Sequence, residues 1–149
     1  MSDDAYTSDQ PTHPSDAMAA LDRLVGSWTV TGEAQGTVRY EWMPGRFFLL
    51  QHVELSQYGQ QITGLEVIGH LRPFGEPPSD EIYSRFYDSA GNTLDYVYEL
   101  VGNTLTIWAG VKGSPAFYRG EFDDDQTISG DWVYPGGGGY SSTSTRSDQ

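Results

Sequence analysis

The sequence predicts an all-β fold, an antiparallel up-and-down β-barrel of about ten strands with a short N-terminal helix. Glycine occurs 18 times and aromatic residues make up 13% of the 149 residues, a composition typical of a turn-rich β protein. From Ser27 onward, short runs of alternating apolar and polar residues are separated by turn residues, with no helical spacing between them. Closure into a barrel removes the edges that such a sheet would otherwise expose.

Charge and composition exclude several classes of function. The formal net charge is −13 and Lys112 is the only lysine, so a nucleic-acid backbone would be repelled. The absence of cysteine excludes disulfides and thiolate metal sites. The N-terminus is acidic, and no apolar run approaches the ~20 residues that a membrane helix needs. We expect a cytoplasmic protein, a monomer or homodimer, with no nucleic-acid or membrane partner.

The first segments of the chain predict a tail followed by a helix. Residues 1–14 are rich in Ser, Asp, Thr and Pro and bury too little apolar surface to offset the entropy of ordering, so they are expected to form a disordered acidic tail. A single barrel domain is expected over 15–146. Ser15 occupies the position of a helix N-cap, and Gly26 ends the helical spacing. The apolar residues at that spacing are Met18, Leu21, Leu24 and Val25.

The first two predicted strands follow this helix, which is expected to plug or flank one end of the barrel. Trp28 and Val30 share one face of the first strand. The second strand, which breaks near Pro44-Gly45, has Val38, Tyr40 and Trp42 on one face.

The next two strands are predicted over 47–56 and 62–71. The third begins with the apolar run 47–50, which is expected to be covered on both sides. Residues 72–80 contain three prolines and cannot pair in a sheet, so they form the longest expected loop, placed near an opening of the barrel.

The remaining strands are bounded by clear turn signals. Gly102-Asn103 is a two-residue hairpin turn. The glycine run 136–139 follows a strand and precedes no helix, so it is a hairpin loop and not a phosphate-binding loop. The expected strands are 81–87, 93–101, 104–109, 115–122, 127–134 and 140–146.

Gly26, Trp28 and Arg146 carry a resemblance to a known pattern. A Gly-x-Trp that enters the first strand after a short helix, with a basic residue on the last strand, resembles the calycin pattern of lipocalins and fatty-acid-binding proteins. The resemblance implies that the indole closes one barrel end while the guanidinium stacks on it and binds the end carbonyls. Segments 24–28 and 40–49 look most like a bacterial family of uncharacterised lipocalin-like proteins, over about 18–146.

Haem is a cofactor to consider within this resemblance. Nitrobindin-type haem proteins are similar in their Gly-x-Trp opening and their ten-stranded barrel. Their iron is held by a histidine late in the chain, whereas no histidine follows His70 here. Haem is therefore disfavoured, and no cofactor is expected.

Charged residues on three neighbouring predicted strands form one candidate site. Arg85 lies between two tyrosines at alternate positions, and Arg119 lies between Phe117 and Glu121, with Glu99 on the strand between them. Projecting inward, either arginine would bind a ligand carboxylate through two parallel hydrogen bonds. The alternative is cross-strand salt bridging on the exterior, because a shift of one residue in strand parity exchanges the two faces.

Histidines provide a second candidate site. His52 and His70 lie on predicted strands and, with a carboxylate such as Glu66, have the chemistry to bind a metal or transfer a proton. Their spacing does not require either role, so surface or hydrogen-bonded structural histidines are the favoured interpretation and no metal site is assigned.

The aromatic residues lead to the functional prediction. Tyr96, Tyr98 and Trp108, if they face inward, place phenol and indole donors in a cavity suited to a flat or amphipathic molecule. We therefore predict binding of a small hydrophobic or amphipathic ligand inside the barrel. The alternatives are a cyclase or isomerase that uses a His or Glu of the cavity for proton transfer, and a packed barrel that binds a partner.

Overall fold

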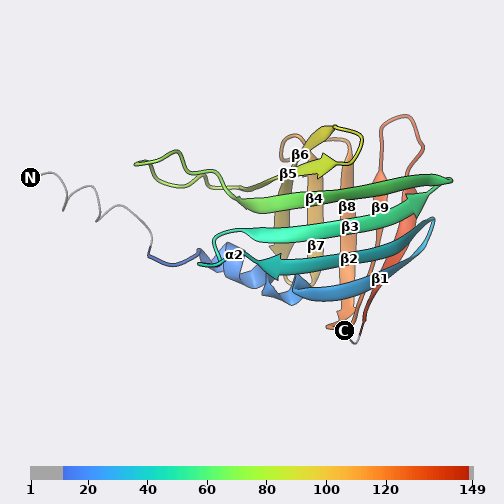
Figure 1. Cartoon of the computed structure of the whole chain (residues 1–149), viewed down its shortest axis with the longest axis horizontal. Helices are drawn as coiled ribbons and strands as arrows, with labels where there is room; N and C mark the ends of the chain where they lie inside the picture. The colour runs from blue at the N-terminus through green and yellow to red at the C-terminus, as the bar shows by residue number, and fades with distance from the viewer. Residues whose placement is uncertain (1–11, 148–149) are drawn as a thin grey trace, which may run out of the picture.

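Ten antiparallel strands close into a barrel in the computed structural model, which describes residues 12–147. Each strand pairs with its neighbours along the chain, and the first strand pairs with the last (Figure 1). The predicted fold class is therefore confirmed. A disordered tail is expected over residues 1–14. Residues 1–11 of that segment lie outside the described residues.

The strand boundaries follow the turn signals of the sequence. The strands are β1 (Gly26–Gly32), β2 (Ala34–Trp42), β3 (Leu49–Gln57), β4 (Gln60–His70), β5 (Ile82–Asp88), β6 (Thr93–Val101), β7 (Thr104–Ala109), β8 (Phe117–Asp124), β9 (Thr127–Val133) and β10 (Tyr140–Arg146). The predicted ranges 93–101, 104–109 and 140–146 coincide with β6, β7 and β10.

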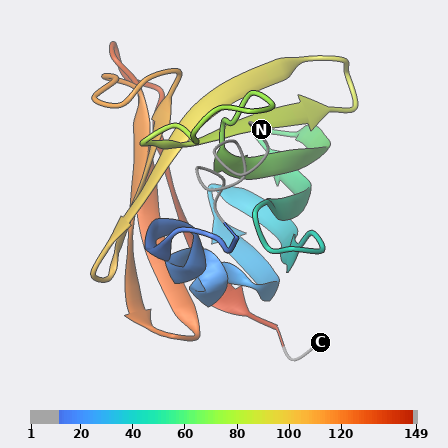
Figure 2. The same ribbon diagram turned by 90° about the vertical axis from the view of Figure 1, so that its left-hand side faces the viewer.

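A short helix covers one end of the barrel. It consists of α2 (Asp16–Ala20) and a tighter 3-10 turn, η1 (Leu21–Leu24). The Ser15 hydroxyl accepts a hydrogen bond from the Met18 backbone N–H at 3.1 Å, as expected of an N-cap. Figure 2 looks onto this end and shows the helix lying across it. Within residues 12–147, no helix is long and apolar enough to cross a membrane.

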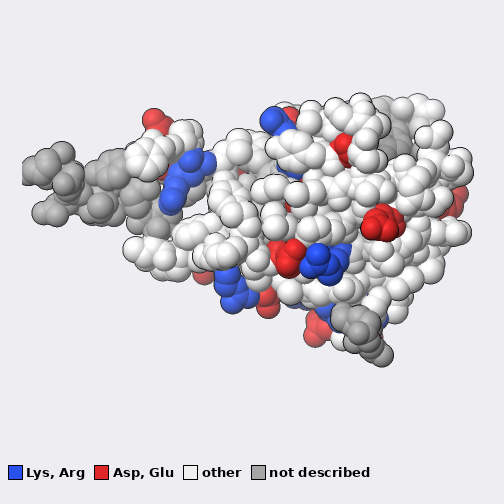
Figure 3. All heavy atoms as spheres, in the orientation of Figure 1, with Lys and Arg blue, Asp and Glu red and all other residues white. Residues whose placement is uncertain are grey.

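The pairing register decides which side chains face the barrel interior. Between β4 and β5, Ile68 pairs with Ser84, and Val67 pairs with Arg85. Ile68 and Ser84 are buried, so the residues that alternate with them point outward. The outward positions carry ion pairs such as that between Arg39 and Glu41. Figure 3 shows acidic and basic side chains lying beside each other on one such face.

Two expectations about this fold are corrected. The run 47–50 is not covered on both sides: Leu49 is buried but Phe48 is 36% exposed, because β3 begins only at Leu49 and residue 48 belongs to the loop that precedes it. The 72–80 loop is not at an opening. It joins β4 to β5 at the end that the helix covers, where His70 binds Ser15 at 2.8 Å.

Candidate functional site

The helix end of the barrel is sealed by Trp28. The indole is 1% exposed, and its Nε1–H donates to the Leu24 carbonyl at 2.8 Å. The Arg146 guanidinium lies 4.3 Å from the indole ring centroid. Its Nη1 and Nη2 donate to the carbonyls of Val25 and Arg23 at 2.6 and 2.7 Å. The cation thus covers the ring and also satisfies backbone carbonyls of the chain entering β1.

Beyond Trp28, the barrel interior contains a cavity of about 350 Å³. Its aliphatic wall comes from consecutive strands near the N-terminus. The cavity extends to Gln57, Asp88 and Tyr134, which lie at the end of the barrel away from the helix. A space of this size and composition suits a small organic molecule. The aliphatic side chains of this wall are Val30, Val38, Val53, Leu55 and Ile62.

An aromatic wall faces this aliphatic one. The Trp132 ring lies 5.7 Å from each of the rings of Tyr96 and Tyr118, measured between centroids. The Tyr118 side chain extends along the sheet over Gly120 and Gly130, which pair in register. A Cβ at either glycine would come within 2.4 or 2.5 Å of the Tyr118 hydroxyl. The two glycines therefore let the ring lie along the wall and leave the interior open.

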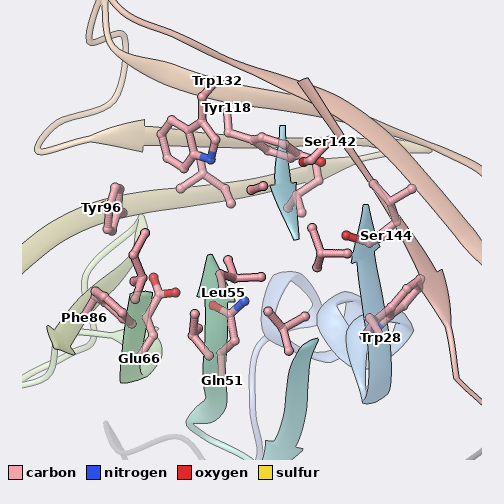
Figure 4. Close-up of a pocket in the computed structure, with 18 of the residues that line it drawn as sticks. Trp28, Gln51, Leu55, Glu66, Phe86, Tyr96, Tyr118, Trp132, Ser142 and Ser144 are labelled. Atoms are coloured by element: carbon pink, nitrogen blue, oxygen red, sulfur yellow. The ribbon is translucent and has the colours of Figure 1, made fainter. Parts of the chain in front are cut away.

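Glu66 is the buried charged side chain of this cavity. It projects from β4 and is 5% exposed. One carboxylate oxygen accepts a hydrogen bond from the Tyr98 hydroxyl at 2.9 Å, and the other accepts one from the Ser84 hydroxyl at 2.5 Å. Figure 4 shows Glu66 and Gln51 across the cavity from Tyr118 and Trp132, with Tyr96 on the same side as Glu66 and Phe86.

Burial determines the charge state of Glu66. Burial raises the pKa of Glu66 from its ordinary value of 4.5 to about 7, although the hydrogen bonds from Ser84 and Tyr98 act in the opposite direction. Burial, followed by the charge of Glu66, raises the pKa of Tyr98 and of Tyr40 well above 10.0. Both phenols are therefore neutral donors, while Glu66 changes charge near neutral pH.

The two candidate arginines lie on the barrel exterior. Arg85 donates from Nε and Nη2 to the Asp95 carboxylate at 2.6 and 3.2 Å, which is the cross-strand pairing considered as the alternative. Arg119 is exposed, with its guanidinium 4.8 Å from the Phe117 ring centroid. The inward placement considered for these residues is corrected, because the register puts both on the face opposite to the cavity-lining Phe86 and Tyr118.

Glu99 and Trp108 also lie outside the cavity. The Glu99 carboxylate pairs with the Lys112 ammonium at 3.2 Å. Trp108 is 9% exposed, and Lys112 Nζ lies 5.8 Å from its ring centroid. The cavity side of β7 is instead formed by Leu105 and Ile107, because alternate residues face opposite ways.

The two histidines are not brought together. His52 lies on the outer face, where its Nε2 binds the Glu41 carboxylate at 2.6 Å. His70 lies at the helix end of β4, where its Nδ1 binds the Ser79 carbonyl at 2.7 Å and its Nε2 contacts Ser15. Neither histidine lines the cavity with Glu66. Over residues 12–147, no group of three acidic or histidine side chains is arranged to hold a metal ion.

Of the candidate ligand-binding residues, Tyr96 and Tyr98 do line the cavity, with Trp28 at its closed end. Sequence reasoning pairs Glu66 only with the histidines and does not predict its place in the cavity lining. A signal was present, because Glu66 falls on the same strand parity as the apolar Ile62 and Ile68. A carboxylate flanked by apolar residues at alternate positions of a strand is a candidate for a buried charge with a role.

Comparisons with known proteins do not assign this chain to a family. The chain matches no protein-family model, and a search of curated proteins finds no significant match. The closed ten-stranded antiparallel barrel with its short helix is consistent with a calycin-like fold on architecture alone.

Proposed function

We propose that this protein binds a small amphipathic molecule inside its barrel. The observation that carries the proposal is the cavity of about 350 Å³, which has aliphatic and aromatic walls and one buried, hydrogen-bonded carboxyl group. Predominantly apolar cavities with a few positioned polar groups are typical of small-molecule sites. The Trp28–Arg146 stack at the closed end adds support, because it matches the resemblance to lipocalin-like carriers.

Filling the cavity by mutation is expected to abolish binding of a neutral apolar probe. Leu55 lines the cavity from β3, so Leu55→Trp places an indole in the space that a ligand would occupy. We expect the affinity for the fluorescent probe N-phenyl-1-naphthylamine to fall by at least about tenfold, because the added side-chain volume competes with the probe. Fluorescence titration of the wild type and the variant measures this effect.

The matched control is Leu50→Trp, the same substitution on the outer face of the same strand. It is expected to leave probe affinity unchanged, with circular dichroism confirming that both variants fold. A wild-type protein that does not bind the probe, or two variants that bind it equally well, would contradict the proposal of an interior site.

The raised pKa of Glu66 supports a second candidate function, in which Glu66 transfers a proton to and from a bound carbonyl compound. A carboxyl group with a pKa of about 7 is well matched to general acid–base catalysis at neutral pH. In an isomerisation, Glu66 would take a proton from one carbon and return it to another, so that no co-reactant is consumed. Tyr96 and Tyr118 would offer phenol O–H groups to the oxygen of the enolate.

This second function predicts faster hydrogen exchange of a bound ketone. We expect the protein to accelerate deuterium incorporation next to the carbonyl of 2-tetralone, measured by proton NMR in heavy water. Glu66→Gln is expected to reduce this acceleration by about 10²-fold, because it removes the base. Glu54→Gln, on the outer face of β3, is the control. Exchange at the rate of buffer alone would leave binding as the only function supported.

A further inference from the structure

The lining of the cavity is acidic. Among the described residues, the cavity is lined by Glu66 and Asp88 and by no lysine, arginine or histidine. From this asymmetry we propose that the ligand is an organic cation, a small molecule with an apolar or aromatic body and a protonated nitrogen that donates a hydrogen bond to Glu66. The inference rests on the proposed binding function and narrows its ligand class.

The Glu66 carboxylate has capacity for a further donor. A carboxylate offers about four acceptor sites, and Glu66 uses one on each oxygen, for Tyr98 and for Ser84. An ionised carboxylate buried without a positive partner is unfavourable. Since none of the cavity-lining residues provides such a partner, a ligand cation would supply it and gain a charge-assisted hydrogen bond.

The groups that surround Glu66 leave its charge uncompensated. Gln51 on β3 and Phe86 on β5 pair with it in register, and neither titrates. The titratable groups that face it are three phenols, Tyr40 on β2 and Tyr96 and Tyr98 on β6. Burial is the main cause of the raised pKa of all three, so they stay neutral. Glu66 is thus the group of this set that changes charge between pH 6 and 8.

The aromatic wall is suited to the same ligand class. The faces of Tyr96, Tyr118 and Trp132 carry negative electrostatic potential, which attracts a cation in a desolvated site. Tyr134 stacks on Trp132 with a centroid distance of 6.1 Å and continues this surface to the rim. A ligand with an aromatic body would stack on Tyr118 and Trp132 while its nitrogen reaches Glu66 across the cavity.

The charge at the rim and over the whole chain favours entry of a cation. The Asn92 backbone N–H donates to the Asp88 carboxylate at 2.9 Å and lowers the pKa of that group, so Asp88 is ionised at neutral pH. The formal net charge of −13 also attracts a cationic ligand to the protein. A fatty-acid-like carboxylate would be repelled by these negative charges. Arg85 and Arg119, the predicted partners of such a carboxylate, lie outside the cavity.

Three compounds that share an indole skeleton test this proposal. Tryptamine carries an ammonium group, tryptophol a neutral hydroxyl and indole-3-propionate a carboxylate, so their affinities separate charge from apolar contact. By isothermal titration calorimetry at pH 8, we expect tryptamine to bind at least about tenfold more tightly than tryptophol, and indole-3-propionate to bind most weakly. In Glu66→Gln, the preference for tryptamine over tryptophol is expected to fall to about twofold or less.

The pH dependence distinguishes a direct charge interaction from packing. Because the pKa of Glu66 is about 7, the ionised fraction rises about tenfold from pH 6 to pH 8, and tryptamine affinity is expected to rise with it. Tryptophol carries no charge, and its affinity is expected to change much less. The Glu66→Gln variant is expected to show no such rise, whereas the outward-facing Glu54→Gln variant retains it.

Each contrary outcome has a distinct meaning. Tryptophol or indole-3-propionate binding as tightly as tryptamine would overturn the cation proposal while leaving interior binding intact. The cation proposal would also be overturned, with interior binding intact, if the protein binds N-phenyl-1-naphthylamine but not tryptamine. A tryptamine preference that persists in Glu66→Gln would overturn the role of Glu66. Failure of the neutral probe itself to bind would remove the proposed function and this inference together.

Discussion

Replacement of Trp28 by alanine is expected to lower the free energy of unfolding by about 3–5 kcal/mol. The indole is 1% exposed and closes the barrel end, where it meets the Phe122 ring edge-on at a centroid distance of 6.4 Å. The substitution leaves a void under Arg146 and removes the hydrogen bond from the indole to the Leu24 carbonyl. Urea denaturation followed by circular dichroism measures the loss.

Two further variants separate the causes of this effect. Trp28→Phe keeps an aromatic ring beneath Arg146 but removes the Nε1–H donor, so it is expected to cost less than the alanine variant. Trp132→Ala truncates a tryptophan that already borders open space in the cavity, so less packing is lost. If Trp28→Ala costs no more than Trp132→Ala, then the indole does not seal the barrel end.

Replacement of Glu66 by glutamine is expected to stabilise the protein at pH 8 by about 3 kcal/mol relative to the wild type. Folding raises the pKa of Glu66 from 4.5 to about 7 because the carboxyl group is buried. The folded state therefore holds the proton more tightly than the unfolded state. The stability contributed by protonated Glu66 is present in full below about pH 4.5 and is lost as the pH rises through 7.

Measuring the stability difference between the wild type and Glu66→Gln at two pH values separates the effect of Glu66 from that of the other titrating groups. At pH 4.5 the wild type and Glu66→Gln both carry a neutral group at this position, so urea denaturation is expected to give similar stabilities. The difference then develops between pH 4.5 and 8 in the direction of a more stable variant. Glu54→Gln, on the outer face of β3, is expected to show no comparable change. An equal difference at both pH values would mean that Glu66 titrates as an exposed carboxyl group does.

A carboxyl group that weakens the fold at neutral pH is informative about function. An apolar residue of similar size in place of Glu66 would avoid the unfavourable burial of a charge. Functional sites often retain groups that reduce stability, because binding or catalysis requires them. The predicted gain in Glu66→Gln and its predicted loss of tryptamine preference are thus two consequences of one buried charge.

Sequence by itself was sufficient for the order of the elements. Alternation along Val38, Tyr40 and Trp42, and the turn at Gly102-Asn103, are local patterns that depend on residues close together in the chain. For this reason β6 and β7 were predicted with their observed ends. Ser15 as a helix cap is equally local. The closing of the sheet followed from the lack of any element to cover its edges.

The tertiary structure alone decided the contents of the cavity. Arg85 and Glu66 both lie on amphipathic strands, and the register between neighbouring strands puts the first outside and the second inside. A shift of one residue would have reversed both placements, and the apolar parity that Glu66 shares with Ile62 and Ile68 only suggests which face is the inner one. The burial of Glu66 depends on Tyr98 and Ser84, which come from other strands, so its titration near neutral pH is a property of the closed barrel. Patterns among neighbouring residues determine where the strands begin and end. The charge and shape of the interior depend on side chains from strands that are distant in the sequence.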